Sequence, residues 1–268
     1  MQANNFNKKM GLCIICGHEM NYAFSSVALQ KYMFDVASCA NCGFLQIVDP
    51  HWLQEAYSDA IADTDTGLVA RNILICKQLK PLLYSLFGNN GSYVDFGGGT
   101  GLLVRLMRDA GMDFYWHDQY CQNIHARGFE FTANIRKYEA LTAFEVFEHV
   151  QDPVAFLKDA LGKTKSKLII FSTECYEGLP PDPEHWWYYG FSRGQHISFY
   201  QRKTLQYIGD RLNLCFITNG QFHILCDSYL SKSVGKYLKS RFLQYMTRFR
   251  ASRNLSSKAW TDHLFLMK

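Results

Sequence analysis

Between residues 68 and 118 the apolar positions change from helical to strand spacing and back again. Residues 68–87 carry apolar side chains at helical spacing and predict a long helix, in which Pro81 marks a kink or the start of a new helix. Residues 92–96 form a short β-type run, and residues 102–110 again have one apolar helical face. The glycine-rich stretch between them predicts the order strand, glycine loop, helix.

The same alternation continues toward the end of the chain. Residues 112–118 and 140–145 predict two more strands, and residues 167–172 predict a buried one. Asp152 precedes Pro153 where a further helix is expected to begin, as helix N-caps do, and residues 213–226 predict a hairpin around Asn219-Gly220. Together these patterns predict an α/β fold, a Rossmann-like sheet with helices on both faces.

Four of the nine cysteines form two close pairs near the start of the chain, Cys13 with Cys16 and Cys39 with Cys42. Each pair has the spacing C-x-x-C followed by glycine, which lets the backbone turn sharply beside two thiolates. Four thiolates suit Zn²⁺, and a complete set of protein ligands leaves no open position for chemistry. We predict a structural zinc site with His18 at the surface, the alternatives being a redox-active pair or two disulfides.

The glycine loop lies where a nucleoside-type cofactor can approach the backbone, and amide groups at the following helix start point toward its polar atoms. The dinucleotide fingerprint G-x-G-x-x-G needs a glycine at the position of Leu102, so NAD fits poorly. The pattern that begins at Asp95 instead resembles the first motif of class I S-adenosylmethionine-dependent methyltransferases. This resemblance implies that Asp95 orients loop and ligand, and that the loop lies against the methionine part of the cofactor. The loop glycines assigned to the cofactor site are Gly97, Gly98, Gly99 and Gly101.

A second predicted strand ends at Asp118, which Gln119 follows. In a Rossmann-like fold an acid at this place grips the two ribose hydroxyls. We predict that Asp118 is the ribose ligand and that Gln119 belongs to the same site, the alternative being an acid that only shapes the turn. The region between Asp118 and Glu145 is short and leaves the adenine contacts open.

The stretch from residue 140 to Pro153 resembles the fourth-strand motif of the same methyltransferases, in which an acid is followed by Glu-His and Asp-Pro. This resemblance implies that Glu145 lies at the active-site end of the strand, so we assign it to both the cofactor and the catalytic site. The pair Glu148-His149 either shapes this loop or takes part in chemistry, and His149 is a reserve catalytic base.

Aromatic residues crowd the stretch 180–200 around two histidines. Aromatic faces stack on sugar rings or planar acceptors, and histidine titrates near neutrality. We predict that this stretch forms one wall of the site that binds the methyl acceptor. The alternative is a packed lid whose histidines only form hydrogen bonds. A hydroxyl or carbon acceptor must lose a proton to a base. We rank His196 first and Tyr200 second for this role, with Glu145 and His149 in reserve.

The cysteine pairs, the glycine loop and the sequence Gln-His-Ile-Ser-Phe-Tyr at 195–200 together resemble bacterial zinc-containing methyltransferases that act on nucleotide-linked sugars, including sugar C-methyltransferases. The resemblance implies a nucleotide-linked sugar or surface-glycan precursor as the acceptor. In those C-methyltransferases a glutamate precedes the histidine, where this chain has Gln195, so O- and C-methylation both stay open. An RNA methyltransferase and a catalytically silent S-adenosylmethionine-binding protein are the further alternatives.

The last part of the chain is basic. Residues 232–253 contain seven basic side chains and no acidic one, with apolar positions at helical spacing at Leu238, Phe242, Tyr245 and Phe249. We expect a helix docked on the domain, the alternatives being contact with anionic groups of the acceptor or peripheral contact with membrane headgroups. The predicted division of the chain is a zinc module at 1–50, a connecting helical segment at 51–90, the cofactor-binding domain at 91–228 and this extension at 229–268.

Composition excludes several other classes of protein. With 268 residues, 48% of them hydrophobic and 15% aromatic, the chain can bury the core of one α/β domain with a small appendage. No apolar run reaches the roughly 18 residues of a membrane span, and the first residues lack a signal-peptide pattern, so we expect a cytoplasmic protein. The net charge of +4 is too small to indicate a nucleic-acid partner.

Overall fold

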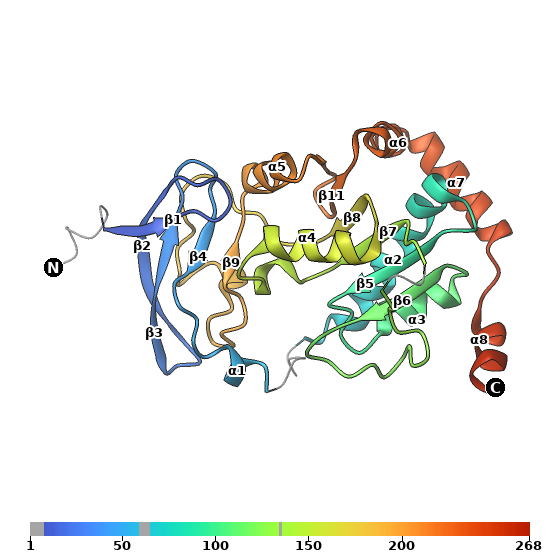
Figure 1. Ribbon diagram of the computed structural model, residues 1–268, viewed down its shortest axis with the longest axis horizontal. Coiled ribbons are helices and arrows are strands. Elements are labelled where there is room, and N and C mark those ends of the chain that lie inside the picture. Colours follow the sequence, from blue (N-terminus) through green and yellow to red (C-terminus); the bar gives the residue numbers. More distant parts are fainter. Residues whose placement is uncertain (1–7, 59–64, 134–135) are drawn as a thin grey trace. The chain divides into compact units, whose positions relative to one another are not determined.

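The computed structural model describes residues 8–58, 65–133 and 136–268, which form two compact units (Figure 1). The described part of the first unit comprises 8–58, 145–158 and 172–216, and the remainder belongs to the second. These units differ from the predicted division at 50, 90 and 228, because two stretches assigned to the cofactor-binding domain belong to the N-terminal unit. The start of the predicted zinc module and residues 59–64 of the connecting segment lie outside the described residues.

The first unit is built on a five-stranded sheet in the order β1-β2-β3-β4-β9. Neighbouring strands are antiparallel throughout, and Leu45 pairs with Phe199 where the last strand joins. Phe34 and Val36 are buried whereas Met33 is 73% exposed, so alternate positions of β3 face the core. The strands are β1 (Lys9–Leu12), β2 (Glu19–Ala28), β3 (Tyr32–Ser38), β4 (Leu45–Ile47) and β9 (Ser198–Phe199).

Hydrogen bonds explain why the stretch 172–216 belongs to this unit. The Thr204 hydroxyl donates to the carbonyl of Cys42 at 2.8 Å, and the Tyr176 hydroxyl donates to the carbonyl of Gly43 at 2.5 Å. The second cysteine pair is therefore covered by residues that follow it by more than 130 positions. The short helices here are α1 (Leu53–Ala56), η1 (Phe147–His149), η2 (Trp187–Tyr189) and α5 (Arg202–Arg211).

The second unit contains a six-stranded sheet in the order β10-β11-β8-β7-β5-β6. The pairs from β6 through β5 and β7 to β8 are parallel, and β11 runs antiparallel to β8. This order confirms the predicted Rossmann-like α/β sheet, including the closing hairpin. The strands are β5 (Ser92–Phe96), β6 (Asp113–His117), β7 (Ala140–Ala143), β8 (Leu168–Phe171), β10 (Cys215–Thr218) and β11 (His223–Cys226).

Helices flank this sheet, and α2 packs against α3, α6 and α7. Pro81 lies inside the single helix α2, so the alternative of a new helix start there is wrong. The Asp152 side chain accepts hydrogen bonds from the N–H groups of Val154 and Ala155, which confirms it as the cap of α4. The helices are α2 (Leu68–Phe87), α3 (Leu102–Asp109), α4 (Pro153–Thr164), α6 (Ser228–Lys239), α7 (Arg241–Asn254) and α8 (Ala259–Leu266).

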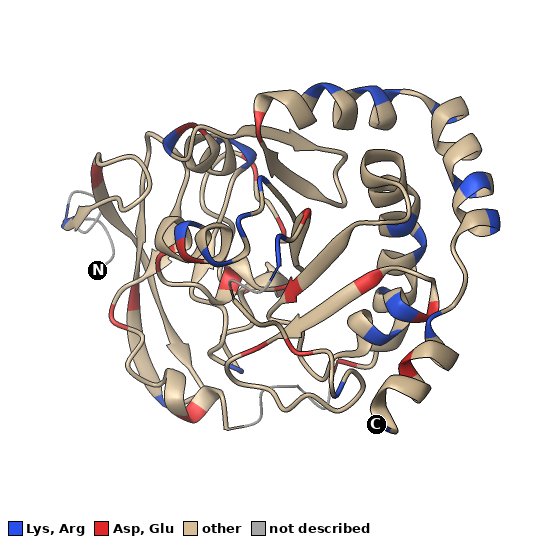
Figure 2. Ribbon diagram, turned by 45° about the vertical axis from the view of Figure 1, so that its right-hand side comes forward, with Lys and Arg blue, Asp and Glu red and all other residues tan. Residues whose placement is uncertain are grey.

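The basic segment forms two helices, α6 and α7, because the Ser240 side chain caps α7 and interrupts the run. Blue stretches of ribbon, which mark Lys and Arg, follow both helices in Figure 2. Phe242 and Tyr245 of the expected apolar stripe are 74% and 68% exposed, whereas Thr247 and Ala251 are buried. The extension thus docks as expected, but through a different face of α7.

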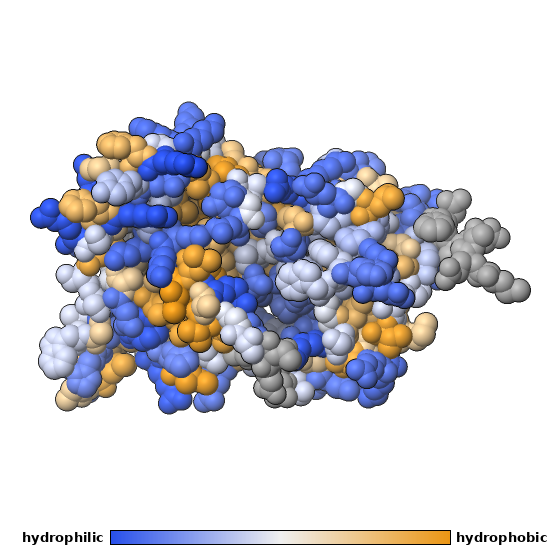
Figure 3. Space-filling model, turned by 180° about the vertical axis from the view of Figure 1, so that it is seen from behind, coloured by the Kyte–Doolittle hydropathy of each residue, from blue (hydrophilic) through white to orange (hydrophobic). Residues whose placement is uncertain are grey.

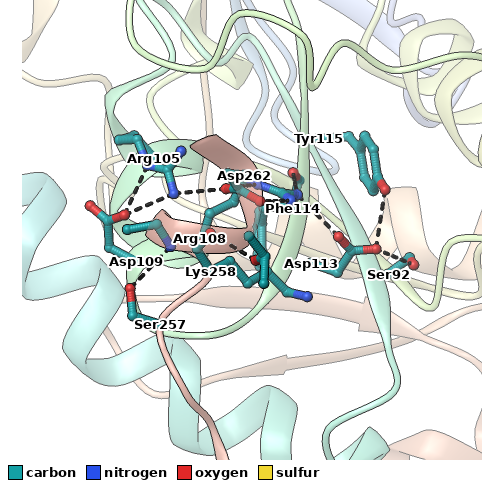
Figure 4. Close-up of polar contacts among 12 residues, drawn as sticks. Ser92, Arg105, Arg108, Asp109, Asp113, Phe114, Tyr115, Ser257, Lys258 and Asp262 are labelled. Carbon is teal, nitrogen blue, oxygen red and sulfur yellow. Dashed lines mark hydrogen bonds and ion pairs between the residues drawn. The ribbon is translucent and has the colours of Figure 1, made fainter. Parts of the chain in front are cut away.

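The last helix, α8, is fixed to the second unit by a buried ion pair. Both Asp262 carboxylate oxygens accept hydrogen bonds from Arg108 of α3, at 2.7 and 2.8 Å, and Arg105 adds one at 2.9 Å (Figure 4). Arg108 and Asp262 are each 4% exposed. Planar bidentate pairing of this kind fixes geometry as well as charge. Arg108 also bonds Asp113 and the carbonyl of Phe114, so it links α8 to β6.

Hydrophobic side chains are interspersed with hydrophilic ones on the face of the molecule seen in Figure 3. Among the described residues, no helix combines the length and the apolar composition needed to cross a membrane.

Candidate cofactor site and histidine cluster

The loop after β5 has a backbone that requires glycine. Gly97, Gly99 and Gly101 have φ values of 69°, 53° and 85°, a left-handed region that side chains disfavour. A Cβ at Gly98 would lie 2.9 Å from the Trp116 ring and 3.2 Å from the Asp95 carboxylate, so no larger residue fits without movement. A Cβ at Gly99 would meet nothing within 4 Å, which leaves the backbone there open to a ligand.

Asp95 supports this loop from inside the sheet. Its side chain is 3% exposed and accepts a 2.5 Å hydrogen bond from the hydroxyl of Thr142, its partner on β7. Burial raises the pKa of Asp95 to about 7, against the lowering effect of the Thr142 bond, and the charge of Asp118 raises it further. Asp95 therefore positions the loop from below, in keeping with the orienting role that the motif implied.

Asp118 is brought directly to the glycine loop, as the two motifs predicted. Its Oδ2 accepts the N–H of Gly99 at 2.9 Å, and its Oδ1 accepts the N–H groups of Tyr120 and Cys121 at 2.7 and 2.8 Å. A carboxylate offers about four acceptor positions, so these bonds leave capacity for a ribose hydroxyl. Asp118 thus shapes the turn and remains suited to the ribose, and Gln119 beside it is exposed.

Sequence reasoning missed the segment that supports the loop from the other side. The N–H groups of Ile124 and His125 both donate to the carbonyl of Thr100, at 3.0 and 2.9 Å. The Asn123 side chain lies 2.8 Å from where a Cβ of Gly101 would be. Residues 118–130 have neither helical nor strand periodicity, and the structure shows turns and bends there, so only these non-local contacts reveal the role of the segment.

Glu145 has a strained backbone at the point where the chain passes from the second unit to the first. Its φ is 55°, which is rare for a residue other than glycine and persists only where surroundings enforce it. Here Ser172 supplies the restraint, because its hydroxyl accepts the Glu145 N–H at 3.0 Å and donates to Oε1 at 2.5 Å. Such strain is common at functional sites, which supports the assignment of Glu145.

Glu148, His149 and His196 come together in the first unit. One ligand atom from each lies within 4.8 Å of the others, and the two imidazole centroids are 4.9 Å apart. The segments that carry them are joined by the N–H of Ile197, which donates to the carbonyl of Glu148 at 2.8 Å. The sequence marked both histidines, but it did not predict that they would meet around Glu148.

Burial controls the charges in this cluster. Burial lowers the pKa of His149 to about 3, and the charge of His196 lowers it further, so His149 is neutral near pH 7. Burial also raises the pKa of Glu148, whereas His196 and hydrogen bonds from Tyr188 and Thr173 lower it. Glu148 is 1% exposed, and its Oε2 has no hydrogen-bond partner among the described residues.

The aromatic stretch contributes largely to the buried core of the first unit. Tyr188, Tyr189, Phe191 and Phe199 are buried against one another in the first unit, although Trp187 is 77% exposed. Tyr200 is fully buried, and its hydroxyl donates to the carbonyl of Phe147 at 2.7 Å. Burial raises the pKa of Tyr200 well above its ordinary value, which disfavours it as a base relative to His196.

The four cysteines converge as predicted. The Sγ atoms of Cys13 and Cys42 are 3.5 Å apart, those of Cys16 and Cys39 are 3.4 Å apart, and all four lie within 4.8 Å of one another. These distances exclude disulfides between these sulfurs, which need about 2.05 Å. Tetrahedral ligation at about 2.3 Å places sulfurs about 3.8 Å apart, so the donor set fits Zn²⁺. His18 is exposed, as expected.

Residues 70–218, more than half of the chain, match the model of a family described as a methyltransferase domain. The chain belongs to this family. The glycine loop, the acid that ends β6 and the parallel sheet are thus parts of a methyltransferase, and the predicted class of S-adenosylmethionine-dependent methyltransferase is confirmed. No curated protein matches this sequence.

Solved methyltransferase structures resemble the chain at low sequence identity. The plantazolicin methyltransferase BpumL in complex with SAH is 9% identical, with a TM-score of 0.45 over 67% of this chain and 95% of its own. An O-methyltransferase family protein from Burkholderia thailandensis is 11% identical, with a TM-score of 0.47 over 66% of this chain and 62% of its own. Human N-acetylserotonin methyltransferase in complex with SAM is 11% identical, with a TM-score of 0.41 over 66% of each.

Proposed function

We propose that this methyltransferase transfers the methyl group of S-adenosylmethionine to a small-molecule acceptor, a nucleotide-linked sugar or surface-glycan precursor. The observation that carries the cofactor assignment is the hydrogen bond from the Gly99 N–H to Asp118, which places a carboxylate beside an open glycine backbone. Asp118 binds the ribose hydroxyls with Gln119 beside it, and the loop lies against the methionine part. Glu145 keeps the cofactor-binding role that the fourth-strand motif implies. Asp95 holds the loop in position.

Methyl transfer from a sulfonium needs mainly alignment of nucleophile, carbon and sulfur. With a hydroxyl acceptor, the new O–C bond forms as the C–S bond breaks, S-adenosylhomocysteine leaves and the hydroxyl proton must be removed. We assign this activation to the cluster that contains His196, ahead of Tyr200 and Glu145. The Nδ1 of His196 donates to the carbonyl of Tyr188 at 2.6 Å, so its Nε2 carries the lone pair when the ring is neutral.

The choice of a sugar or glycan precursor rests on the resemblance to zinc-containing sugar methyltransferases. Four convergent thiolates support that part of the resemblance. In this proposal Cys13, Cys16, Cys39 and Cys42 hold a structural zinc, which supplies folding free energy to a segment too short to bury a core of its own. The acceptor atom is a hydroxyl oxygen or an acidic carbon. Both are retained because His196 follows Gln195 here, whereas a glutamate precedes the histidine in the sugar C-methyltransferases.

One observation favours RNA as a second candidate acceptor. The seven basic side chains of α6 and α7 are all exposed and follow two consecutive helices (Figure 2). Such a surface attracts phosphate backbones, and its binding weakens steeply as salt rises. Retention of structured RNA on the purified protein, lost progressively with salt, would support this candidate, and no retention at low salt would remove it.

Mass spectrometry of sugar-nucleotide pools tests the first candidate. Cells that produce the active protein should contain a methylated sugar nucleotide. Cells that produce the Asp118→Ala variant should contain only the unmethylated compound, which is lighter because it has hydrogen in place of the methyl group. The purified protein should then convert the unmethylated compound while S-adenosylhomocysteine accumulates in equal amount. If the protein binds S-adenosylmethionine in calorimetry but no glycan precursor is converted, the acceptor class is wrong. A catalytically silent binding protein would behave in the same way with every acceptor.

A further inference from the structure

Glu148 presents an unsatisfied carboxylate oxygen in the interior of the first unit. Its side chain is 1% exposed, and Oε2 has no hydrogen-bond partner among the described residues. Leaving a buried polar atom unpaired costs free energy, and a charged one costs several times more. Proteins therefore satisfy such groups with a donor, a water molecule or a cation. Two imidazoles, those of His149 and His196, each have a ring nitrogen within 4.8 Å of a Glu148 carboxylate oxygen.

Both imidazoles are held in the tautomer that suits metal ligation. The Nδ1 of His149 lies 3.1 Å from the carbonyl oxygen of Gln195, and the Nδ1 of His196 lies 2.6 Å from that of Tyr188. A carbonyl only accepts hydrogen bonds, so in the neutral ring each Nδ1 carries the proton and each Nε2 has a lone pair. Histidines that ligate metals usually donate their other ring N–H to a carbonyl or carboxylate in this way.

Hydrogen bonds between two chain segments keep these side chains in place. The Ile197 N–H donates to the carbonyl of Glu148 at 2.8 Å, and the Ser198 hydroxyl donates to that of Val150 at 2.7 Å. The Tyr200 hydroxyl reaches the carbonyl of Phe147. The segment that carries Glu148 and His149 is thus tied along its length to the strand that follows His196. Such fixed ligands lose little entropy when an ion binds.

We propose that Glu148, His149 and His196 bind a divalent transition-metal cation, a site distinct from the four cysteines. Two imidazoles and one carboxylate suit Zn²⁺, Fe²⁺, Co²⁺ or Mn²⁺, and three protein ligands leave positions for exogenous oxygen. The proposal deepens the proposed function and rests on it for the site's role. An acceptor oxygen on the cation would lose its proton more readily, and His196 would contribute to activation as a ligand.

The cation can be counted without any turnover. The full-length protein is brought to equilibrium dialysis against buffered Zn²⁺, and the bound zinc per chain is measured by elemental mass spectrometry. The wild type should bind one zinc more than Glu148→Gln and one more than His196→Ala. His185→Ala is the matched control, because His185 is an exposed histidine of the same unit, paired with Asp182, and its loss should not change the count.

Zinc bound at the four cysteines distinguishes loss of the second cation from misfolding of the variant. It belongs to the same unit as the cluster, so a variant that retains zinc on its cysteines while losing the other ion has kept that unit folded. Equal zinc counts in the wild type and Glu148→Gln overturn the proposal. Formation of S-adenosylhomocysteine is measured separately. If the protein binds a second zinc but methylates no acceptor, only the proposed function is contradicted. If it transfers the methyl group but binds no second zinc, only the proposed cation site is contradicted.

Discussion

The Asp118 carboxylate accepts the backbone N–H of Gly99 at 2.9 Å, and this hydrogen bond joins the end of β6 to the glycine loop. This bond helps to fix the shape of the loop. Because the same carboxylate also accepts the N–H groups of Tyr120 and Cys121, one side chain organises both the glycine loop and the turn that follows β6. Preorganisation of this kind reduces the entropy lost on binding.

Asp118→Ala should weaken S-adenosylmethionine binding by about 100-fold or more. Hydrogen bonds to a charged group contribute about 1.5–3 kcal/mol each, and the variant removes those to the ribose together with those that hold the loop. Isothermal titration calorimetry measures the change. Asp118→Asn is the control, because it keeps the shape of the side chain and should lose less. Near-normal affinity of the alanine variant would show that the ribose lies elsewhere.

His196→Ala should slow methyl transfer by about 10² to 10⁴-fold, the range of positioned acid–base groups, while cofactor affinity stays the same. His196 donates to the carbonyl of Tyr188 and packs against His149, and neither residue belongs to the glycine loop. Single-turnover formation of S-adenosylhomocysteine gives the rate, and calorimetry gives the affinity. Turnover equal to that of the wild type would eliminate His196 from acceptor activation.

Asp262→Asn should lower the free energy of unfolding by about 3–5 kcal/mol, because it leaves Arg108 buried with an incomplete partner. Burial tends to raise the pKa of Asp262, but hydrogen bonds and charge from Arg108 and Arg105 outweigh burial and lower it. Because its pKa is lowered in the folded state, the Asp262 carboxylate stabilises the folded protein at pH values above its ordinary pKa of about 3.9. This stabilisation is lost as the pH falls below that value.

Urea titrations of wild type and Asp262→Asn at pH 7 and pH 3 check both statements. The difference between the two proteins should be large at pH 7 and smaller at pH 3. Asp109→Asn is the matched control, since Asp109 also pairs with Arg105 but its side chain is 47% exposed, and surface pairs contribute about 0–1 kcal/mol. Equal unfolding free energies for wild type and Asp262→Asn at pH 7 would contradict the structural role of the pair.

Asp95 should make the second unit less stable as pH rises. Burial raises the pKa of Asp95 to about 7, so the folded state favours the protonated form. Its stabilising contribution is complete below the unfolded value of about 3.9 and declines up to about pH 7. Asp95→Asn should remove this decline, and melting temperatures of both proteins between pH 4 and pH 8 test it. Parallel curves would show that folding does not raise the pKa of Asp95.

Removal of zinc should destabilise the first unit. A structural zinc contributes about 10 kcal/mol or more to folding, so a strong chelator should lower the melting temperature, and Zn²⁺ should restore it. Cys42→Ser should behave like the chelated protein, because Cys42 is fully buried in the four-sulfur group. Cys121→Ser lies outside that group and serves as the control. A melting curve that does not respond to chelator would contradict the zinc proposal.

The sequence alone predicted those parts of the candidate sites that consist of residues close together in the chain. The loop from residue 97 to 101 and the knuckle at Cys13 and Cys16 are local patterns whose backbone conformation requires glycine. The cluster around Glu148 could not be predicted in this way, because it depends on the pairing of residues 148 and 197 across the unit. Helical spacing also failed to show which apolar face of α7 is buried, since both faces carry apolar side chains.

The pairing of Leu45 with Phe199 has a consequence for biosynthesis. The strand that completes the N-terminal sheet is translated about 150 residues after the strand it joins. At a translation rate of about 5–20 residues per second, the edge of β4 has no partner strand for on the order of ten to thirty seconds. Exposed edges of this kind recruit other strands. We therefore expect nascent chains that stall before residue 198 to aggregate or to engage chaperones, whereas chains released after residue 216 close the sheet themselves.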